Sequence, residues 1–151
     1  MKKNLFMYLL ICALILPTAV NALAANTSDT PFNFVVNATN FNVKTGPREK
    51  QNSTAVYCKI TDIENHSKVR VRALACNADG EINKTQNGTS GYSASYVTLT
   101  LGRQYSIHTH IYEDGYRSAK LAFESLNVFN PERVKGVWSP DSTRSYEDAW
   151  Q

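Results

Sequence analysis

The chain lacks several features that would point to a common biochemical function. Its 151 residues contain no block of lysine and arginine interleaved with aromatics, no glycine-rich phosphate loop and no Gly-x-Ser-x-Gly elbow. A nucleic-acid partner, a P-loop nucleotide site and an α/β-hydrolase nucleophile are therefore not expected. The sequence also shows no internal repeat and no convincing amphipathic helix, and nothing in it indicates a cofactor.

Long hydrophobic runs are also missing, apart from one near the start. Lys2 and Lys3 precede an apolar run from Leu5 to Leu16, and Ala22-Leu23-Ala24 has the small-x-small pattern of a cleavage site. This order is typical of a signal peptide, whereas a membrane-spanning helix needs about 20 apolar residues. We expect cleavage after Ala24, a secreted (extracellular) product and no permanent membrane span.

Charge of either sign is nearly balanced once the signal is removed. Lys2 and Lys3 are two of the 16 basic residues, so residues 25–151 carry 14 basic and 13 acidic side chains. We divide the chain into a signal peptide (residues 1–24), a flexible lead-in (25–30) and a single β domain (31–151), a length that suits one modest core.

Cysteine is scarce, with three in the chain. Cys12 lies in the predicted signal, which leaves Cys58 and Cys76 in the mature protein. An even number of cysteines in an exported chain favours a disulfide, and this one would close a loop of about 18 residues and contribute about 3 kcal/mol. Two buried free thiols and half of a metal site are the alternatives.

Alternating apolar and polar residues predict several short strands. They cover residues 31–36, 53–63, 68–76, 95–101 and 105–112. We expect residues 105–112 to form the central strand. Residues 117–129 fit a short helix or a strand, and the alternation favours a strand.

Polar residues separate these strands. Turns at residues 64–67 and 102–103 predict two hairpins, whereas 45–52 and 77–92 have the composition of loops. Phe41 and Val43 are expected to continue the pairing of the first strand after a turn. The pattern as a whole predicts an all-β fold, a small antiparallel β-sandwich or barrel.

Two histidines offer a possible metal site. His108 and His110 lie on the same side of the predicted strand, so both could reach one zinc or copper ion. His66, Glu113 or Asp114 could complete the ligand set. The more ordinary interpretation is two polar residues on a solvated strand face.

Carboxylates offer a second possible chemistry. Glu113 and Asp114, together with Asp141, could act as acid and base on a glycan. Adjacent residues point apart, however, and Asp114-Gly115 is typical of a turn. We therefore expect no catalytic residues.

The C-terminal part holds both tryptophans. Ser139 to Ser142 reads as a turn in which Asp141 or Ser142 bonds nearby backbone, with Trp138 packing over the end of the sheet. Exposed aromatics can also grip a sugar or a protein surface. Candidate binding residues are therefore Tyr112, Tyr116, Trp138, Asp141 and Trp150.

Three blocks of sequence are similar to a family of short secreted proteins of Gram-positive bacteria that is classed as a domain of unknown function. They are Asp29–Phe34, Ile111–Tyr116 and Gly136–Ser142. The resemblance implies an exported, mostly β protein that tolerates a disulfide. It implies no activity.

These observations favour a non-enzymatic binding module with an unknown extracellular or cell-envelope ligand. A secreted bacteriocin-like antagonist or small toxin is the alternative. A metal-dependent or glycan-active enzyme is the third hypothesis.

Overall fold

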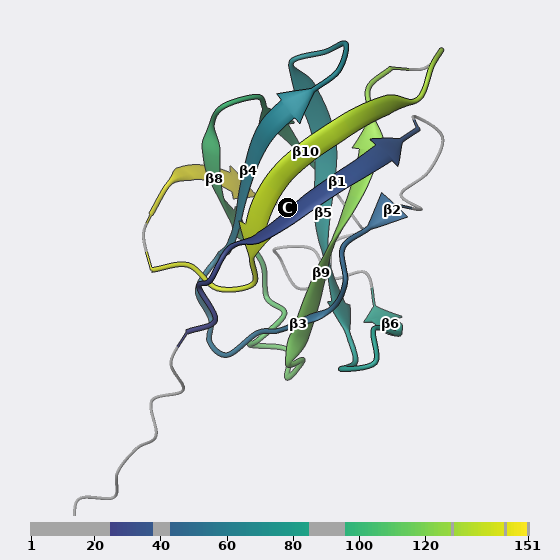
Figure 1. Cartoon of the computed structure of the whole chain (residues 1–151). Coiled ribbons are helices and arrows are strands. Elements are labelled where there is room, and N and C mark those ends of the chain that lie inside the picture. Colours follow the sequence, from purple (N-terminus) through teal and green to yellow (C-terminus); the bar gives the residue numbers. More distant parts are fainter. Residues whose placement is uncertain (1–24, 38–42, 85–95, 128, 144, 151) are drawn as a thin grey trace, which may run out of the picture.

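The computed structural model describes residues 25–37, 43–84, 96–127, 129–143 and 145–150 (Figure 1). The predicted signal peptide lies outside them. The described residues form the strands β1 (Thr30–Val36), β2 (Val43–Lys44), β3 (Arg48–Glu49), β4 (Val56–Ile63), β5 (Lys68–Cys76), β6 (Ile82–Lys84), β7 (Val97–Thr100), β8 (Gln104–His108), β9 (Ser118–Ser125), β10 (Glu132–Ser139) and β11 (Glu147–Trp150). In this part of the chain, no helix has the length and hydropathy that a bilayer crossing requires.

Two sheets pack face to face, which confirms the predicted all-β fold as a sandwich (Figure 1). The first sheet has the order β1-β10-β4-β8-β11. The second has the order β2-β9-β5-β6, with β3 also paired to β9 and β7 to β5. β11 runs parallel to β8, and the other pairs are antiparallel.

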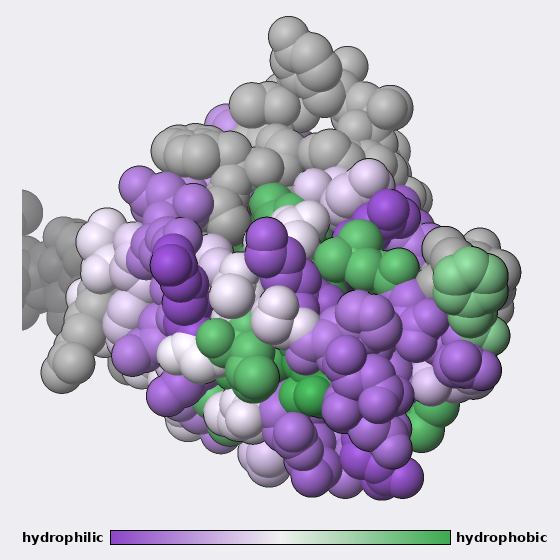
Figure 2. All heavy atoms as spheres, turned by 90° about the horizontal axis from the view of Figure 1, so that it is seen from above, coloured by the Kyte–Doolittle hydropathy of each residue, from purple (hydrophilic) through white to green (hydrophobic). Residues whose placement is uncertain are grey.

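Alternate side chains of the two sheets fill the space between them. β4 contributes Val56, Cys58 and Ile60, and β5 contributes Val69 and Val71, all without exposed surface. Fully burying one such aliphatic side chain contributes about 1.5–3 kcal/mol. On the face shown in Figure 2, the apolar side chains gather in small groups separated by polar ones.

The predicted hairpin at residues 64–67 is wrong. β4 belongs to the first sheet and β5 to the second, so the turn carries the chain across the sandwich. Both strands then face the same interior with their apolar side. An arch is a connection that joins strands of two different sheets. A hairpin and an arch require the same alternation of residues, so the periodicity could not distinguish one from the other.

The predicted hairpin at residues 102–103 is an arch too, because β7 pairs with β5 whereas β8 pairs with β4. The two arches lie together: Leu101 N donates to Ser67 O, and Gly102 N donates to Ile60 O. Gly102 has a φ of 81°, a value that favours glycine. The strand predicted over 105–112 ends at His108 and lies next to the sheet edge, so the prediction of a central strand is also wrong.

Other strands differ from the predictions in smaller ways. Residues 118–125 form β9, which confirms the preference for a strand. The expected loop 45–52 contains β3, and Val43 pairs with Phe123 in the second sheet. Phe41 lies outside the described residues. β10, which no pattern predicted, joins β1 to β4, and a side chain at Gly136 would collide with the Lys59 carbonyl oxygen and the Phe32 ring.

The expected disulfide is absent, since Cys58 and Cys76 are both free and buried. The interior residues of β5 are Val69, Val71, Ala73 and Ala75, whereas Cys76 has the opposite parity. Its side chain therefore leaves the other face of the sheet, away from Cys58 in the interior. Burial raises the pKa of both thiols.

A thiol titration checks this arrangement. We expect both cysteines of the mature protein to stay unreactive toward a thiol reagent in the native state, since the thiolate is the reactive form. In denaturant two thiols per mature chain should react. If the two thiols reacted only after treatment with a reductant, the protein would contain the disulfide after all.

Candidate functional site

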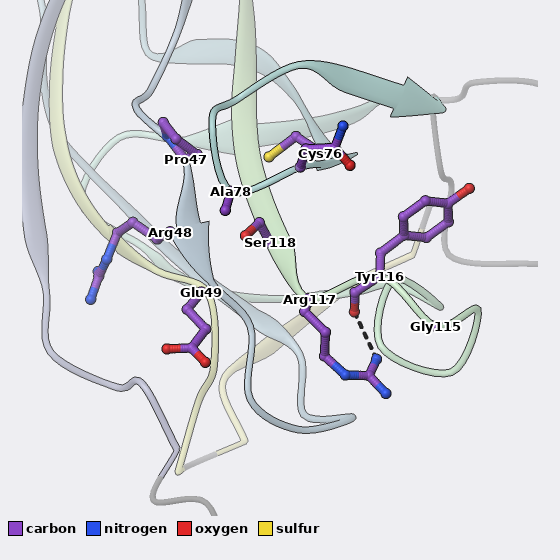
Figure 3. A pocket seen from close by; sticks show the side chains of 10 residues that line it. Pro47, Arg48, Glu49, Cys76, Ala78, Gly115, Tyr116, Arg117 and Ser118 are labelled. Carbon is purple, nitrogen blue, oxygen red and sulfur yellow. Dashed lines mark hydrogen bonds between the residues drawn. The ribbon is translucent and has the colours of Figure 1, made fainter.

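The segments that line a pocket of about 610 Å³ lie at the end of the sandwich where Figure 1 labels β3. Three segments that are distant in sequence line it: residues 47–49, 76–78 and 115–118. They come from β3, the end of β5 and the start of β9, as Figure 3 shows.

Backbone pairing and a lysine side chain hold the three segments together. Arg48 lies opposite Ala119 and Glu49 opposite Ser118 in the β3–β9 ladder. The turn after β5 is attached to β9 by Lys120, whose Nζ donates to Gly80 O at 2.6 Å. The walls therefore belong to the sheet framework and to a turn tied to it.

The rim of the pocket carries two exposed side chains of opposite charge, Glu49 and Arg117. Arg117 Nη1 donates to the carbonyl oxygens of Tyr112 (3.0 Å) and Tyr116 (2.9 Å). Its guanidinium carbon lies 4.0 Å from the centroid of the Tyr112 ring, a cation–π contact. Figure 3 shows Glu49 and Arg117 extending toward the same edge of the pocket. Arg117 is thus held in place while part of its charge still faces solvent.

The inner wall is nearly neutral. Cys76 is 2% exposed and Ser118 is 7% exposed, and the other neutral lining residues include Pro47 and Ala78. Because burial raises the pKa of Cys76, its sulfur stays a protonated thiol at neutral pH. This wall is suited to contact with a ligand and lacks a ready nucleophile.

Arg48 also lines the pocket but points away from it (Figure 3). Its Nη1 donates to Ser28 O (2.6 Å) and Trp138 O (3.2 Å), and its Nη2 donates to Asn26 Oδ1 (2.6 Å). Arg48 therefore attaches the lead-in segment to the sandwich.

A buried ion pair lies next along the chain. Lys50 and Asp141 have no exposed side-chain surface, and Lys50 Nζ lies 3.1 Å from Asp141 Oδ1. Nζ also donates to Thr54 O (2.6 Å) and Pro140 O (2.8 Å). Asp141 Oδ2 accepts from the backbone N–H groups of Asn26 and Gln51, each at 2.9 Å. Burial lowers the pKa of Lys50, and the nearby Asp141 opposes this shift.

Trp138, three residues before Asp141 in the chain, is buried, with 1% of its surface exposed. The Arg48 guanidinium lies 5.7 Å from the centroid of its ring. Two of the predicted binding residues, Trp138 and Asp141, are therefore placed inside the molecule. Tyr112 and Tyr116 are half-buried; Tyr116 lines the pocket, and Tyr112 contacts Arg117. Trp150 belongs to β11, but the structure does not describe its side chain.

The histidines have separate partners. His108 Nε2 lies 2.7 Å from Asp148 Oδ1, and His66 Nδ1 lies 2.7 Å from the buried Glu132 Oε2. Across the described residues, no three His, Cys, Asp or Glu side chains are grouped to hold a metal ion. The ligand set suggested for His108 and His110 is therefore not assembled there.

The carboxylates of the glycan-cleavage hypothesis lie in different environments, some exposed and one buried. Glu113 and Asp114 are exposed on a turn closed by Gly115, which has a φ of 88°. Asp141 is buried and paired with Lys50.

A second hollow of about 390 Å³ lies near Tyr57 and Tyr146, whose ring centroids are 4.8 Å apart. Its lining is mainly hydroxyl-bearing and includes Thr27, Ser139 and Thr143. It is an alternative place for a polar ligand.

No sequence pattern singled out Glu49, Lys50 or Arg117. The first two lie in a segment with the composition of a loop, and Arg117 starts a segment of ambiguous type. The three consecutive charged residues 48–50 were the only sequence signal for this site. Their order does not indicate which side chain is exposed and which is buried.

Comparison with known proteins identifies a family and no activity. No curated protein and no solved structure matches the chain. The model of the family described as protein of unknown function (DUF2712) matches residues 18–142, which include the pocket and the Lys50–Asp141 pair. The chain therefore belongs to this family of proteins of unknown function.

Proposed function

We propose that the chain is an exported, non-enzymatic protein that binds a polar component of the cell envelope in the pocket of residues 47–49, 76–78 and 115–118. Support for export comes from the basic start, the apolar run and the small-residue site within residues 1–24. The match to an unknown-function family is compatible with this proposal and adds no activity to it.

The observation that carries the proposal is the pair of opposite charges at the rim of a rigid pocket. Glu49 and Arg117 are both exposed; Glu49 belongs to β3, and Arg117 directly precedes β9, the strand with which β3 pairs. A ligand with an ammonium and a carboxylate group could contact both. Short peptides, including the peptide parts of cell-wall polymers, have this chemistry, and Tyr116 adds an aromatic wall.

Retention on isolated cell walls tests the proposal. Arg117→Gln and Glu49→Gln should each weaken retention of the purified protein by about 10- to 100-fold, because a hydrogen bond to a charged group contributes about 1.5–3 kcal/mol. A soluble wall peptide should compete with the walls for the wild-type protein.

Arg103→Gln and Glu147→Gln are matched controls. This Arg–Glu pair is also exposed, at 3.0 Å; Arg103 directly precedes β8 and Glu147 belongs to β11, and neither residue lines the pocket. The control variants should bind like the wild type. Equal retention of all four variants would contradict the proposal, and so would inhibition of competing bacteria by a protein that does not bind walls.

A further inference from the structure

The Lys50–Asp141 pair has the geometry of two groups that can react with each other. Both side chains are fully buried, and Nζ lies 3.1 Å from Oδ1. Cγ, the carbon that an amine would attack, is bonded to Oδ1, so this contact holds the amine and the carboxyl group together at a high effective concentration. Burial also lowers the pKa of Lys50, which favours the neutral, nucleophilic amine.

The hydrogen bonds of Lys50 fix the direction of its nitrogen. Two N–H groups donate to Thr54 O and Pro140 O, and the third points to Asp141 Oδ1. If the third proton moves to Oδ1, the other two bonds stay in place. The lone pair that remains on Nζ then faces the new O–H group of Asp141, and a rotation of the carboxyl group brings Cγ into line with it.

The other carboxyl oxygen lies where a developing negative charge would be stabilised. Asp141 Oδ2 is 2.9 Å from the backbone nitrogens of both Asn26 and Gln51. Two backbone N–H donors at this distance form an oxyanion hole in enzymes of acyl transfer. Here the donors come from the lead-in segment and from the residue after Lys50.

We propose that Lys50 and Asp141 condense into an intramolecular amide bond. The proton moves from Nζ to Oδ1, Nζ attacks Cγ, and the negative charge gathers on Oδ2. A second proton then passes from nitrogen to Oδ1, the Cγ–Oδ1 bond breaks and one water molecule leaves. The ammonium and carboxylate supply every atom, so no oxidant or other reactant is needed.

The bond would join two distant parts of the chain. Lys50 follows β3 of the second sheet, and Asp141 follows β10 of the first, 91 positions later. The link would therefore fasten the two sheets together covalently beside Trp138. It is independent of the ligand proposed for the pocket.

Intact-mass spectrometry tests the bond directly. The protein is purified from cells that express the full chain, reduced and denatured, and its N-terminus is determined by peptide mapping. We expect a mass one water molecule below that of the chain so defined. Trypsin should release a branched species that joins peptide 49–59 to peptide 136–144, since an acylated Lys50 is not cleaved.

Two results would overturn the proposal. One is the full, unmodified mass, which would leave Lys50 and Asp141 as a permanent ion pair. The other is a water loss confined to one unbranched peptide, as succinimide formation at Asp79-Gly80 or Asp114-Gly115 would give. Lys50→Arg, which retains the positive charge, should recover the full mass, and a water loss that persists in it would also contradict the bond.

Discussion

Replacing Asp141 with alanine should lower the free energy of unfolding by about 3–5 kcal/mol, because removing one partner leaves a buried charge uncompensated. Lys50 would keep two carbonyl acceptors but lose its only charged hydrogen-bond partner in the described structure. The backbone N–H groups of Asn26 and Gln51 would lose their acceptor as well. Urea denaturation followed by circular dichroism measures the change. This value refers to the ion pair alone, and an amide bond at this position would increase the loss of stability.

Asp62→Ala is the matched control for this prediction. Asp62 also pairs with a lysine, Lys135, at 2.8 Å, but the two side chains are 51% and 44% exposed. Exposed pairs contribute at most about 1 kcal/mol. Equal losses for Asp141→Ala and Asp62→Ala would show that the buried pair does not stabilise the sandwich.

Replacing Trp138 with alanine should cost about 3–5 kcal/mol of unfolding free energy, as expected for a large aromatic side chain removed from a packed interior. Trp138 is 1% exposed and belongs to the core cluster, and Arg48 would also lose its contact with the ring. The measurement is again the urea midpoint and slope.

Phe129→Ala separates burial from the loss of an aromatic ring. Phe129 is 88% exposed, so its replacement should change stability by less than about 0.5 kcal/mol. If Trp138→Ala left stability unchanged and abolished retention on cell walls, Trp138 would be a ligand contact and its assignment as a core residue would be wrong.

Local alternation carried most of the information about where the strands lie. Residues 68–76 were predicted from Val69, Val71 and Ala73, and β5 has the same bounds. β10 was missed because its inward positions include Glu132 and Gly136, which interrupt the apolar pattern. Glu132 is tolerated inside because Ser125 Oγ donates to its Oε1 and His66 contacts its Oε2.

Strand pairing was not readable from the same alternation. Residues 64–67 and 102–103 have the length and polarity of hairpin turns, yet both connect the two sheets. The backbone conformation of the turn decides between a hairpin and an arch, together with the strands that can pair with the edges of the two flanking strands. β4, for example, pairs with β10 and β8, which lie far along the chain.

The candidate site was predicted in part. Tyr112 and Tyr116 were candidates because of their aromatic character; Tyr116 lines the pocket, and the Tyr112 ring contacts Arg117. Glu49 was not predicted, since its place in the pocket depends on the two-residue ladder of β3 with β9. Lys50 was not expected in the interior, because lysine is almost never fully buried unless it is paired.

The central claim is that ligand recognition takes place in the pocket of residues 47–49, 76–78 and 115–118, while residues 138–141 stabilise the interior. Amide chemical shifts of the isotope-labelled protein, recorded as a soluble cell-wall peptide is added, test it most directly. We predict shifts that concentrate in these three segments and saturate together. Shifts confined to the hollow near Tyr57 and Tyr146, or to the segment around Trp138, would contradict the claim.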